Sequence, residues 1–192
     1  MQQITLIGDS IRRGYENFVH DLLAGRVGMV NPEVNGGTSA NVLAHLDPWV
    51  MAIRPDIVQV NCGLHDISKP FGEDVAAVPL EDYAKNVRSI LTRLKTETDA
   101  IVIWAATTPV NQAWHNENKS FDRFEKDVVA YNEVASGIAR ELDIPINDLF
   151  AVVSEAGRDT LLVDDGVHFT PAGYELLGRA VATYLESVLD RL

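Results

Sequence analysis

The stretch QITLIGDS, residues 3–10, places an apolar run directly before a glycine, an aspartate and a serine. Residues 3–7 predict a buried strand, and the amphipathic segment 12–24 predicts the helix that follows it. Ser10 therefore stands at the carboxyl end of a predicted strand. A buried strand followed by a helix is the repeating unit of an α/β protein.

The same alternation of short apolar runs and longer amphipathic segments continues along the chain. Further strands are predicted at residues 27–31, 56–61, 100–106 and 144–146, and further helices at 39–53, 80–97, 122–142 and 171–192. The last helix has a clear start, since Thr170 can cap it and Pro171 suits its first position. We therefore expect a three-layer α/β/α sandwich around a mostly parallel five-stranded sheet, in one domain over residues 1–192. Residues 68–79 and 111–120 are predicted loops.

Charge and hydropathy exclude several classes of partner. The chain of 192 residues has a net charge of -12 and no basic run longer than Arg12-Arg13. A nucleic-acid surface needs clustered Lys and Arg, so we expect no nucleic-acid partner. No stretch approaches the ~20 apolar residues of a membrane span, and the N-terminus lacks the features of a signal peptide. Cys62 is the only cysteine, which suits a reducing compartment and a buried structural role. We expect a cytoplasmic protein without a membrane partner.

Polar and glycine residues follow several of the predicted strands. Ser10 follows the first strand, Gly36 and Gly37 follow the second, and His65 and Asp66 follow the third. Open α/β sheets bind ligands beyond the carboxyl ends of their strands. The sequence therefore predicts one site at this edge of the sheet.

The segment Asp165-Gly166-Val167-His168 supplies what Ser10 would need to react. A serine hydroxyl is a poor nucleophile unless an imidazole takes its proton, and His168 is the candidate base. Asp165, three residues earlier, can orient that ring through one tight turn. Gly-Asp-Ser alone is also typical of an ordinary turn with a helix cap, so the interpretation depends on both segments together.

Over nearly its whole length the chain resembles the SGNH or GDSL-type serine hydrolases, a family of esterases and lipases with a flavodoxin-like α/β fold. Four motifs carry the resemblance: Gly8-Asp9-Ser10, residues 35–39 (NGGTS), residues 63–66 (GLHD), and residues 165–168 (DGVH). The resemblance implies that Ser10 is the nucleophile, His168 the general base and later acid, and Asp165 its orienting residue.

The resemblance also implies an oxyanion hole made by the backbone N–H of Ser10, the backbone N–H of Gly36 and a side-chain donor at position 65. Gly37 is the close alternative to Gly36. The family usually has asparagine where this chain has His65, and a neutral imidazole can replace that amide if its N–H points into the hole. A half-buried structural histidine is the other interpretation of His65. Asp9 is expected to brace its loop by hydrogen bonds to the backbone.

Candidate substrate-binding residues are few. Arg12 lies just after Ser10 and is interpreted either as a contact to a polar or anionic part of a substrate or as a solvated arginine paired with carboxylates. Gly37 lies beside the same site, and Trp114 stands in a predicted polar loop where it could form an aromatic wall. Trp49 and Trp104 are predicted core residues.

The sequence thus predicts a serine hydrolase that cleaves small carboxylic esters through an acyl-enzyme on Ser10, most of all acetyl esters of a carbohydrate or small metabolite. An acyltransferase or thioesterase with the same triad, and a non-catalytic ligand-binding protein, are the alternatives. We expect no cofactor and no metal, because no metal-binding spacing is present. His20, His45 and His115 are expected on solvated helix faces or in a loop, and the oligomeric state is left open.

Overall fold

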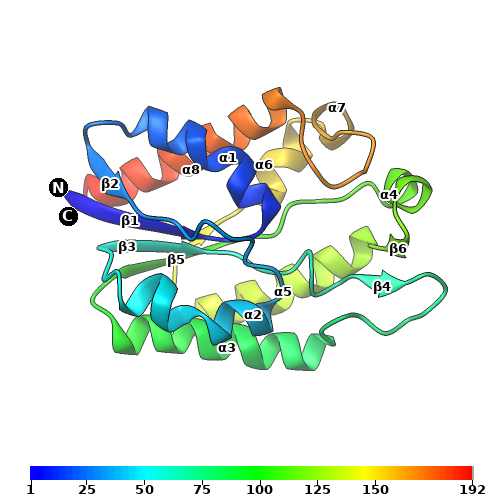
Figure 1. The fold of residues 1–192 in the computed structure, drawn as a ribbon, viewed down its shortest axis with the longest axis horizontal. Helices are drawn as coiled ribbons and strands as arrows, with labels where there is room; N and C mark the ends of the chain where they lie inside the picture. Colours follow the sequence, from blue (N-terminus) through cyan, green and yellow to red (C-terminus); the bar gives the residue numbers. More distant parts are fainter. Residues whose placement is uncertain (192) are drawn as a thin grey trace.

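The computed structural model describes residues 1–191, and its centre is a parallel sheet of five strands (Figure 1). The strands are β1 (Gln2–Ile7), β2 (Val27–Met29), β3 (Ile57–Val60), β5 (Ile101–Ala105) and β7 (Ile146–Asn147). Their order in the sheet is β2-β1-β3-β5-β7, and every neighbouring pair is parallel. This is the strand order of a flavodoxin-like fold, as the sequence predicts.

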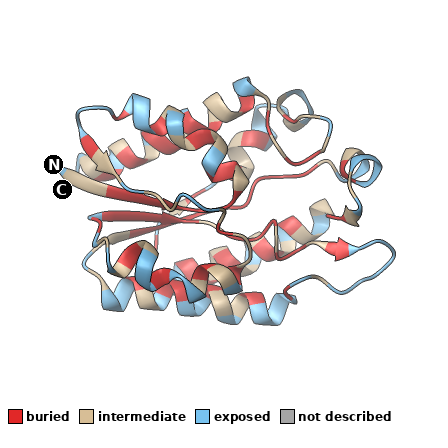
Figure 2. Ribbon diagram, viewed as in Figure 1, coloured by how far each residue is buried: buried red, intermediate tan, exposed pale blue. Residues whose placement is uncertain are grey.

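The apolar runs form the central strands because both faces of the sheet are covered. Ile4 of β1 pairs with Met29 of β2 on one side and with Ile57 of β3 on the other. All four residues of β3 are buried, as are the last four of β1. A parallel sheet buried on both faces requires such continuous apolar runs. Figure 2 shows the strands as a buried layer between helices that are exposed on their outer sides.

The main helices are α1 (Ser10–Leu22), α2 (Ser39–Ala44), α3 (Leu80–Glu97), α5 (Glu125–Glu141), α6 (Leu149–Glu155) and α8 (Pro171–Leu189). Helices α1, α6 and α8 cover one face of the sheet, and α2, α3 and α5 cover the other (Figure 1). The three-layer α/β/α prediction is therefore confirmed. As predicted, Thr170 caps α8, and its hydroxyl accepts a hydrogen bond from the Gly173 N–H at 3.2 Å.

Two glycines let α1 and α8 approach closely. A Cβ at Gly14 of α1 would lie 2.1 Å from the ring of Tyr174, and one at Gly178 of α8 would lie 2.4 Å from the Cβ of Phe18. Real Cβ atoms do not tolerate such distances, so glycine at these positions sets the spacing of the two helices. The N-terminus of α1 carries Ser10, and α8 begins three residues after His168, so this packing relates the two ends of the chain.

Local structure departs from the sequence prediction in several places. The helix predicted over 39–53 is divided into α2 and a short π-helix, η1 (Asp47–Met51). Pro48 has no N–H to continue an α-helical ladder, which accounts for the break. The helix predicted from residue 122 begins at Glu125, because residues 121 and 122 pair as a strand instead.

The predicted loops contain small elements of their own. The segment 111–120 contains helix α4 (Gln112–Asn118), capped by Asn111, whose side chain accepts a hydrogen bond from the Trp114 N–H at 3.2 Å. Strands β4 (Lys69–Pro70) and β6 (Phe121–Asp122) form an antiparallel pair, and the short helix α7 (Arg158–Leu161) follows α6. None of the helices formed by residues 1–191 is long and apolar enough to cross a membrane.

Candidate active site

Ser10, His168 and Asp165 form a continuous hydrogen-bonded chain. Ser10 is the first residue of α1, and its Oγ lies 2.7 Å from Nε2 of His168. The other ring nitrogen of His168, Nδ1, lies 2.6 Å from Oδ2 of Asp165. Although Ser10 and His168 are 158 positions apart, the fold brings them together at the carboxyl end of β1. The arrangement is that of a nucleophile, a base and an orienting carboxylate.

The turn from Asp165 to His168 holds the carboxylate in place. Oδ1 of Asp165 accepts hydrogen bonds from the backbone N–H groups of Val167 at 3.0 Å and His168 at 2.9 Å. Burial acts to raise the pKa of Asp165, but these bonds and the His168 side chain outweigh it and hold that pKa well below its ordinary value. Asp165 is therefore charged throughout the neutral range and can stabilise a protonated His168.

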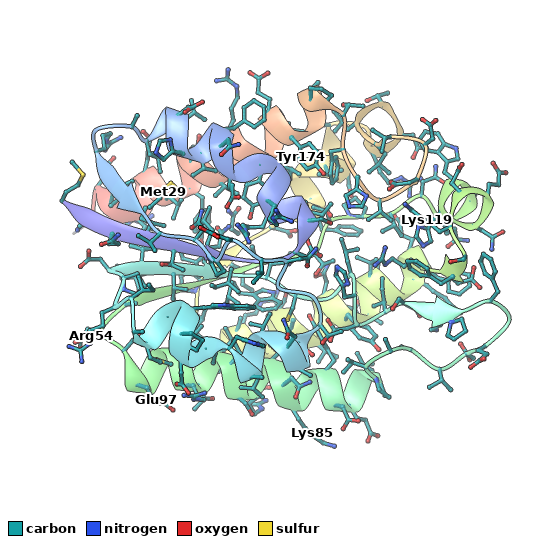
Figure 3. The ribbon with its side chains drawn as sticks, in the orientation of Figure 1. Met29, Arg54, Lys85, Glu97, Lys119 and Tyr174 are labelled. Carbon is teal, nitrogen blue, oxygen red and sulfur yellow. The ribbon has the colours of Figure 1, made fainter. Side chains whose placement is uncertain are left out.

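Lys119 makes a further contact with the same carboxylate. Its Nζ lies 3.1 Å from Oδ2 of Asp165. In Figure 3 Lys119 lies beside α4, at the end of the molecule opposite to Arg54. Lys119 was not a candidate in the sequence, because nothing in its local pattern indicates that α4 packs against the 165–168 turn.

Asp9 braces the turn that carries Ser10, as predicted. Only 1% of its surface is exposed, and its Oδ1 accepts a hydrogen bond from the Ile11 N–H at 2.9 Å. Asp9 is thereby the N-cap of α1. The capped helix places Ser10 where backbone N–H groups lack intrahelical partners.

Gly36 is positioned differently from the expectation. Its backbone N–H donates to the carbonyl of Gly8 at 2.9 Å, and the N–H of Gly37 donates to Oδ1 of Asn35 at 2.8 Å. Both amides are thus already engaged, and the expected oxyanion role of the Gly36 N–H is not supported. Glycine at 36 has another physical reason, since a Cβ there would lie 2.8 Å from the Gly8 oxygen. The left-handed φ of 63° at Gly37 likewise favours glycine.

His65 lies half-buried in the loop after β3, and its ring remains available to a ligand. Neither ring nitrogen has a hydrogen-bond partner among residues 1–191, while its backbone carbonyl accepts from Ser68. Burial, together with the charges of Arg123 and His168, lowers the pKa of His65, against an opposing effect of Asp9. His65 is therefore neutral at neutral pH and carries one N–H donor.

Asp66 connects the second and third motifs instead of taking part in chemistry. It is fully buried, and its carboxylate accepts the backbone N–H of Ser39 at 2.9 Å and the Ser39 hydroxyl at 2.5 Å. Burial raises the pKa of Asp66 to about 6, although the hydrogen bonds from Ser39 act to lower it. The first residue of α2 is thereby attached to the loop that carries His65.

Arg12 is a structural residue. The predicted pairing with a carboxylate is confirmed, but the arginine is buried rather than solvated, and the contact to a substrate is not supported. It is 2% exposed and pairs with Glu16. Its Nη2 also donates to the carbonyls of Pro32 at 2.9 Å and Val34 at 3.0 Å. The guanidinium is therefore occupied by contacts within the protein, and it fixes the loop that leads to Gly36. A sequence pattern could not show this, because its partners depend on how that loop folds over α1.

Trp114 and His115 of α4 lie against the 165–168 turn. A Cβ at Gly166 would come 3.2 Å from the Cβ of Trp114, so the half-buried Trp114 is beside the site. His115 is fully buried, with Nδ1 at 3.1 Å from the backbone carbonyl of Asp165. The expectation of a solvated His115 was therefore wrong, because the predicted loop is a helix packed on this turn.

The expectations for the two remaining histidines, the two remaining tryptophans and the cysteine are confirmed. His20 and His45 are exposed. Trp104 is fully buried, and Trp49 is half-buried against the core. Cys62 is 1% exposed, and burial raises the pKa of its thiol well above the ordinary value, which makes it an unreactive core residue.

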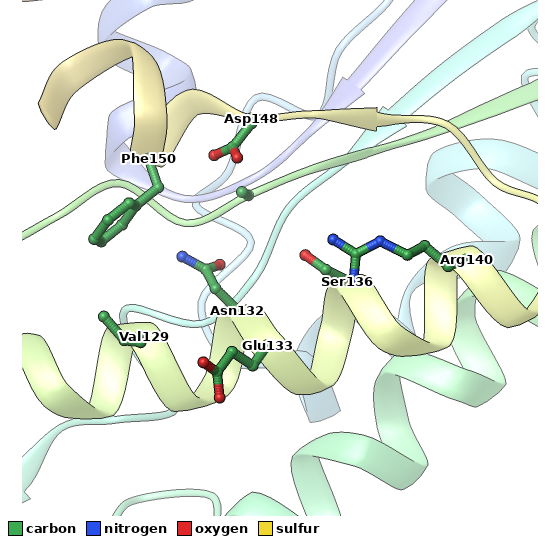
Figure 4. Close-up of a pocket in the computed structure, with 8 residues that line it drawn as sticks. Val129, Asn132, Glu133, Ser136, Arg140, Asp148 and Phe150 are labelled. Atoms are coloured by element: carbon green, nitrogen blue, oxygen red, sulfur yellow. The ribbon is translucent and has the colours of Figure 1, made fainter. Parts of the chain in front are cut away.

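A separate hollow of about 230 Å³ lies between α5 and the carboxyl ends of β5 and β7 (Figure 4). Its lining residues are Ala106, Val129, Asn132, Glu133, Ser136, Arg140, Asp148 and Phe150. The Ser10–His168 pair is not part of this lining. Within residues 1–191, no group of three or more His, Cys, Asp or Glu side chains is arranged to hold a metal ion.

Comparison with known sequences relates residues 6–176 to the GDSL-like lipase/acylhydrolase family. The chain is 27% identical over 163 residues to an acetylxylan esterase of Geobacillus stearothermophilus, an alignment that covers 79% of this chain and 69% of that protein. It is 20% identical over 216 residues to a mouse homologue of isoamyl acetate-hydrolysing esterase 1, covering 99% of this chain and 84% of that protein.

Solved structures share the fold. A lipase/acylhydrolase from Enterococcus faecalis superposes with a TM-score of 0.81 at 24% identity, covering 97% of this chain and 96% of that chain. An acetylxylan esterase from Geobacillus stearothermophilus superposes with a TM-score of 0.78 at 24% identity, covering 95% and 93%. The family match spans most of the chain and agrees with the fold, so this protein belongs to the GDSL-like lipase/acylhydrolase family and is a carboxylic ester hydrolase.

Proposed function

We propose that this protein is a serine esterase that acts through an acyl-enzyme on Ser10. The observation that carries the proposal is the hydrogen-bonded chain from Ser10 through His168 to Asp165. Ser10 Oγ attacks the ester carbonyl while Nε2 of His168 takes its proton, and that proton then passes to the leaving alcohol. Water next attacks the acyl-enzyme by the same route, which releases the carboxylic acid and restores Ser10.

The developing oxyanion needs donors that are free before the reaction. The backbone N–H of Ser10 has no hydrogen-bond partner among the described residues, and it lies at the positive end of α1. His65 can supply a second donor from its neutral ring. With the Gly36 amide bonded to Gly8, Ser10 and His65 are the two groups to which we assign the oxyanion hole.

The substrates we propose are short-acyl esters, above all acetyl groups on a carbohydrate or small metabolite. The relationship to an acetylxylan esterase supports this choice. Trp114 supports it further, because its half-buried indole beside the 165–168 turn suits contact with a sugar ring.

The test is hydrolysis of 4-nitrophenyl acetate by the wild type, Ser10→Ala and Ser187→Ala. Ser187 is an exposed serine of α8 and serves as the matched control. We expect Ser10→Ala alone to lose activity, and a fluorophosphonate probe to form an adduct located on Ser10 by mass spectrometry. Equal rates in all three proteins, without an adduct, would contradict the assignment.

The acyl preference is tested with 4-nitrophenyl octanoate. If the wild type hydrolyses it faster than 4-nitrophenyl acetate, that result would contradict the short-acyl preference.

A further inference from the structure

Arg123 is a buried arginine without an acidic partner. It directly follows β6 and is 7% exposed. Its Nε donates to the carbonyl of Leu64 at 2.6 Å, and its guanidinium carbon lies 4.9 Å from the centre of the Phe121 ring. Within residues 1–191, no carboxylate oxygen lies at ion-pair distance from it. A buried cation without a counterion is energetically costly, so its retention calls for an explanation.

The contacts of Arg123 place it between the two loops that form the active site. Leu64, which holds its Nε, directly precedes His65. On the other side, the ring of Phe121 packs edge-to-face on His115 at 5.0 Å, and His115 contacts the carbonyl of Asp165 at 3.1 Å.

The electrostatics agree with this position. Burial is the main cause of the lowered pKa values of His65 and His115, and the charge of Arg123 lowers both pKa values further. Asp9 and Asp165 in turn act to raise the pKa of Arg123 against the lowering effect of burial. Arg123 thus shares its surroundings with the turns of the proposed nucleophile and base.

The terminal nitrogens of Arg123 are available for binding. Nε is occupied by Leu64, but neither Nη1 nor Nη2 makes a hydrogen bond to another described residue. Neither nitrogen is among the fully buried polar atoms that lack a partner in this part of the chain, so both retain contact with solvent. Together they present N–H donors in the planar fork that matches a carboxylate.

We propose that Arg123 binds a carboxylate of the substrate, and hence that the preferred esters are anionic. This proposal rests on the proposed esterase function. The electrostatic field of the whole protein would not favour anionic esters, because a net charge of -12 disfavours the approach of anions. Recognition has to be local. Two charge-assisted hydrogen bonds to the fork correspond to a preference of roughly 10- to 100-fold in kcat/KM for a charged over a matched neutral ester.

The experiment compares matched ester pairs at constant ionic strength. 4-Acetoxybenzoate against 4-acetoxybenzamide places the charge on the alcohol half, and mono-4-nitrophenyl adipate against 4-nitrophenyl hexanoate places it on the acyl half. Rates with Ser10→Ala are subtracted as background. We expect the wild type to prefer the charged member of at least one pair, and the pair concerned identifies which half carries the carboxylate.

Arg123→Gln should lower kcat/KM for the charged ester far more than for its neutral partner, so that the preference is lost. Arg13→Gln, at an exposed arginine, makes the same change in net charge and should retain the preference. Equal rates on charged and neutral esters in the wild type, or a preference that survives in Arg123→Gln, would overturn the proposal. A merely structural Arg123 would reduce both members of a pair equally, which also counts against it.

A second measurement does not depend on the variant folding. 4-Hydroxybenzoate should inhibit the wild type at least tenfold more strongly than 4-hydroxybenzamide if the alcohol half is bound, and adipate more strongly than hexanoate if the acyl half is. No difference in either pair would argue against a carboxylate site.

The two proposals can fail separately. If neutral-ester hydrolysis depends on Ser10 but charge has no effect, only the role of Arg123 fails. If hydrolysis does not depend on Ser10, the proposed function itself fails.

Discussion

Ser39 donates both its backbone N–H and its hydroxyl to the carboxylate of Asp66, and both residues are fully buried. The pair joins the start of α2 to the loop after β3, and Asn86 of α3 adds a hydrogen bond to the Ser39 hydroxyl at 3.0 Å. Because Asp66 is adjacent to His65, this buried pair fixes the backbone from which the His65 ring projects.

The Asp66 carboxyl should make stability depend on pH. Burial raises its pKa from 3.8 to about 6, so the folded protein binds a proton here more tightly than the unfolded chain does. The stability that this proton contributes is present at low pH and is lost as the pH rises through about 6. Between pH 5 and pH 7 the loss is about 1 kcal/mol.

Urea unfolding of the wild type and Asp66→Asn at both pH values measures this effect. The difference in free energy of unfolding, wild type minus variant, should be smaller at pH 7 than at pH 5. Any constant cost of altering the Ser39 contacts cancels between the two pH values. A difference that does not change with pH would show that Asp66 does not titrate in this range.

His65 should be replaceable by asparagine but not by alanine. His65→Ala removes the proposed side-chain donor and should lower kcat on the order of 10²–10³, whereas His65→Asn provides an amide N–H in its place and should be comparatively mild. Steady-state kinetics on 4-nitrophenyl acetate measures both. Because the ring makes no hydrogen bond to other described residues, neither variant should change Tm substantially. Similar losses of kcat in the two variants would contradict a hydrogen-bonding role.

Gly166 should tolerate no side chain. Its φ is 69°, and a Cβ there would lie 2.3 Å from the backbone oxygen of Asn111. Gly166→Ala should therefore cost about 2–5 kcal/mol of stability through backbone strain and overpacking, and it should displace Asp165 from His168. Gly25 is the matched control, since its φ is 78° but a Cβ would contact nothing within 4 Å.

Gly25→Ala should cost only the strain of about 1–2 kcal/mol and leave kcat unchanged. Chemical unfolding and esterase kinetics on both variants separate these effects. If Gly166→Ala were as stable and active as Gly25→Ala, that result would contradict the close packing of α4 on the 165–168 turn.

The fold was predictable because its decisive signals are local. Each central strand is an apolar run, and Thr170-Pro171 marks the start of α8 in the sequence itself. The Ser10, Asp165 and His168 grouping was predictable because parallel strands end at one edge of the sheet and because the spacing from Asp165 to His168 fits one turn.

What could not be predicted depends on contacts between distant segments. Arg12 was not recognised as structural because its partners, the carbonyls of Pro32 and Val34, come from a loop without a regular pattern. The Gly36 amide bonds to Gly8, a contact that no motif encodes. Arg123 was not a candidate residue in the sequence, because its role depends on where β6 lies relative to Leu64. The Asn111 cap of α4 was a local signal that could have been used.

The close packing of α1 against α8 through Gly14 and Gly178 has a consequence for biosynthesis. Ser10, the proposed nucleophile, emerges from the ribosome with the first helix. Its proposed base, His168, lies in the last quarter of the chain, and the helix after it must dock before the two residues meet. A nascent chain should therefore have no esterase activity until translation has passed His168. Recovery of esterase turnover consequently reports the joining of the two ends of the molecule, and kinetic refolding followed by activity should lag behind refolding followed by helix content.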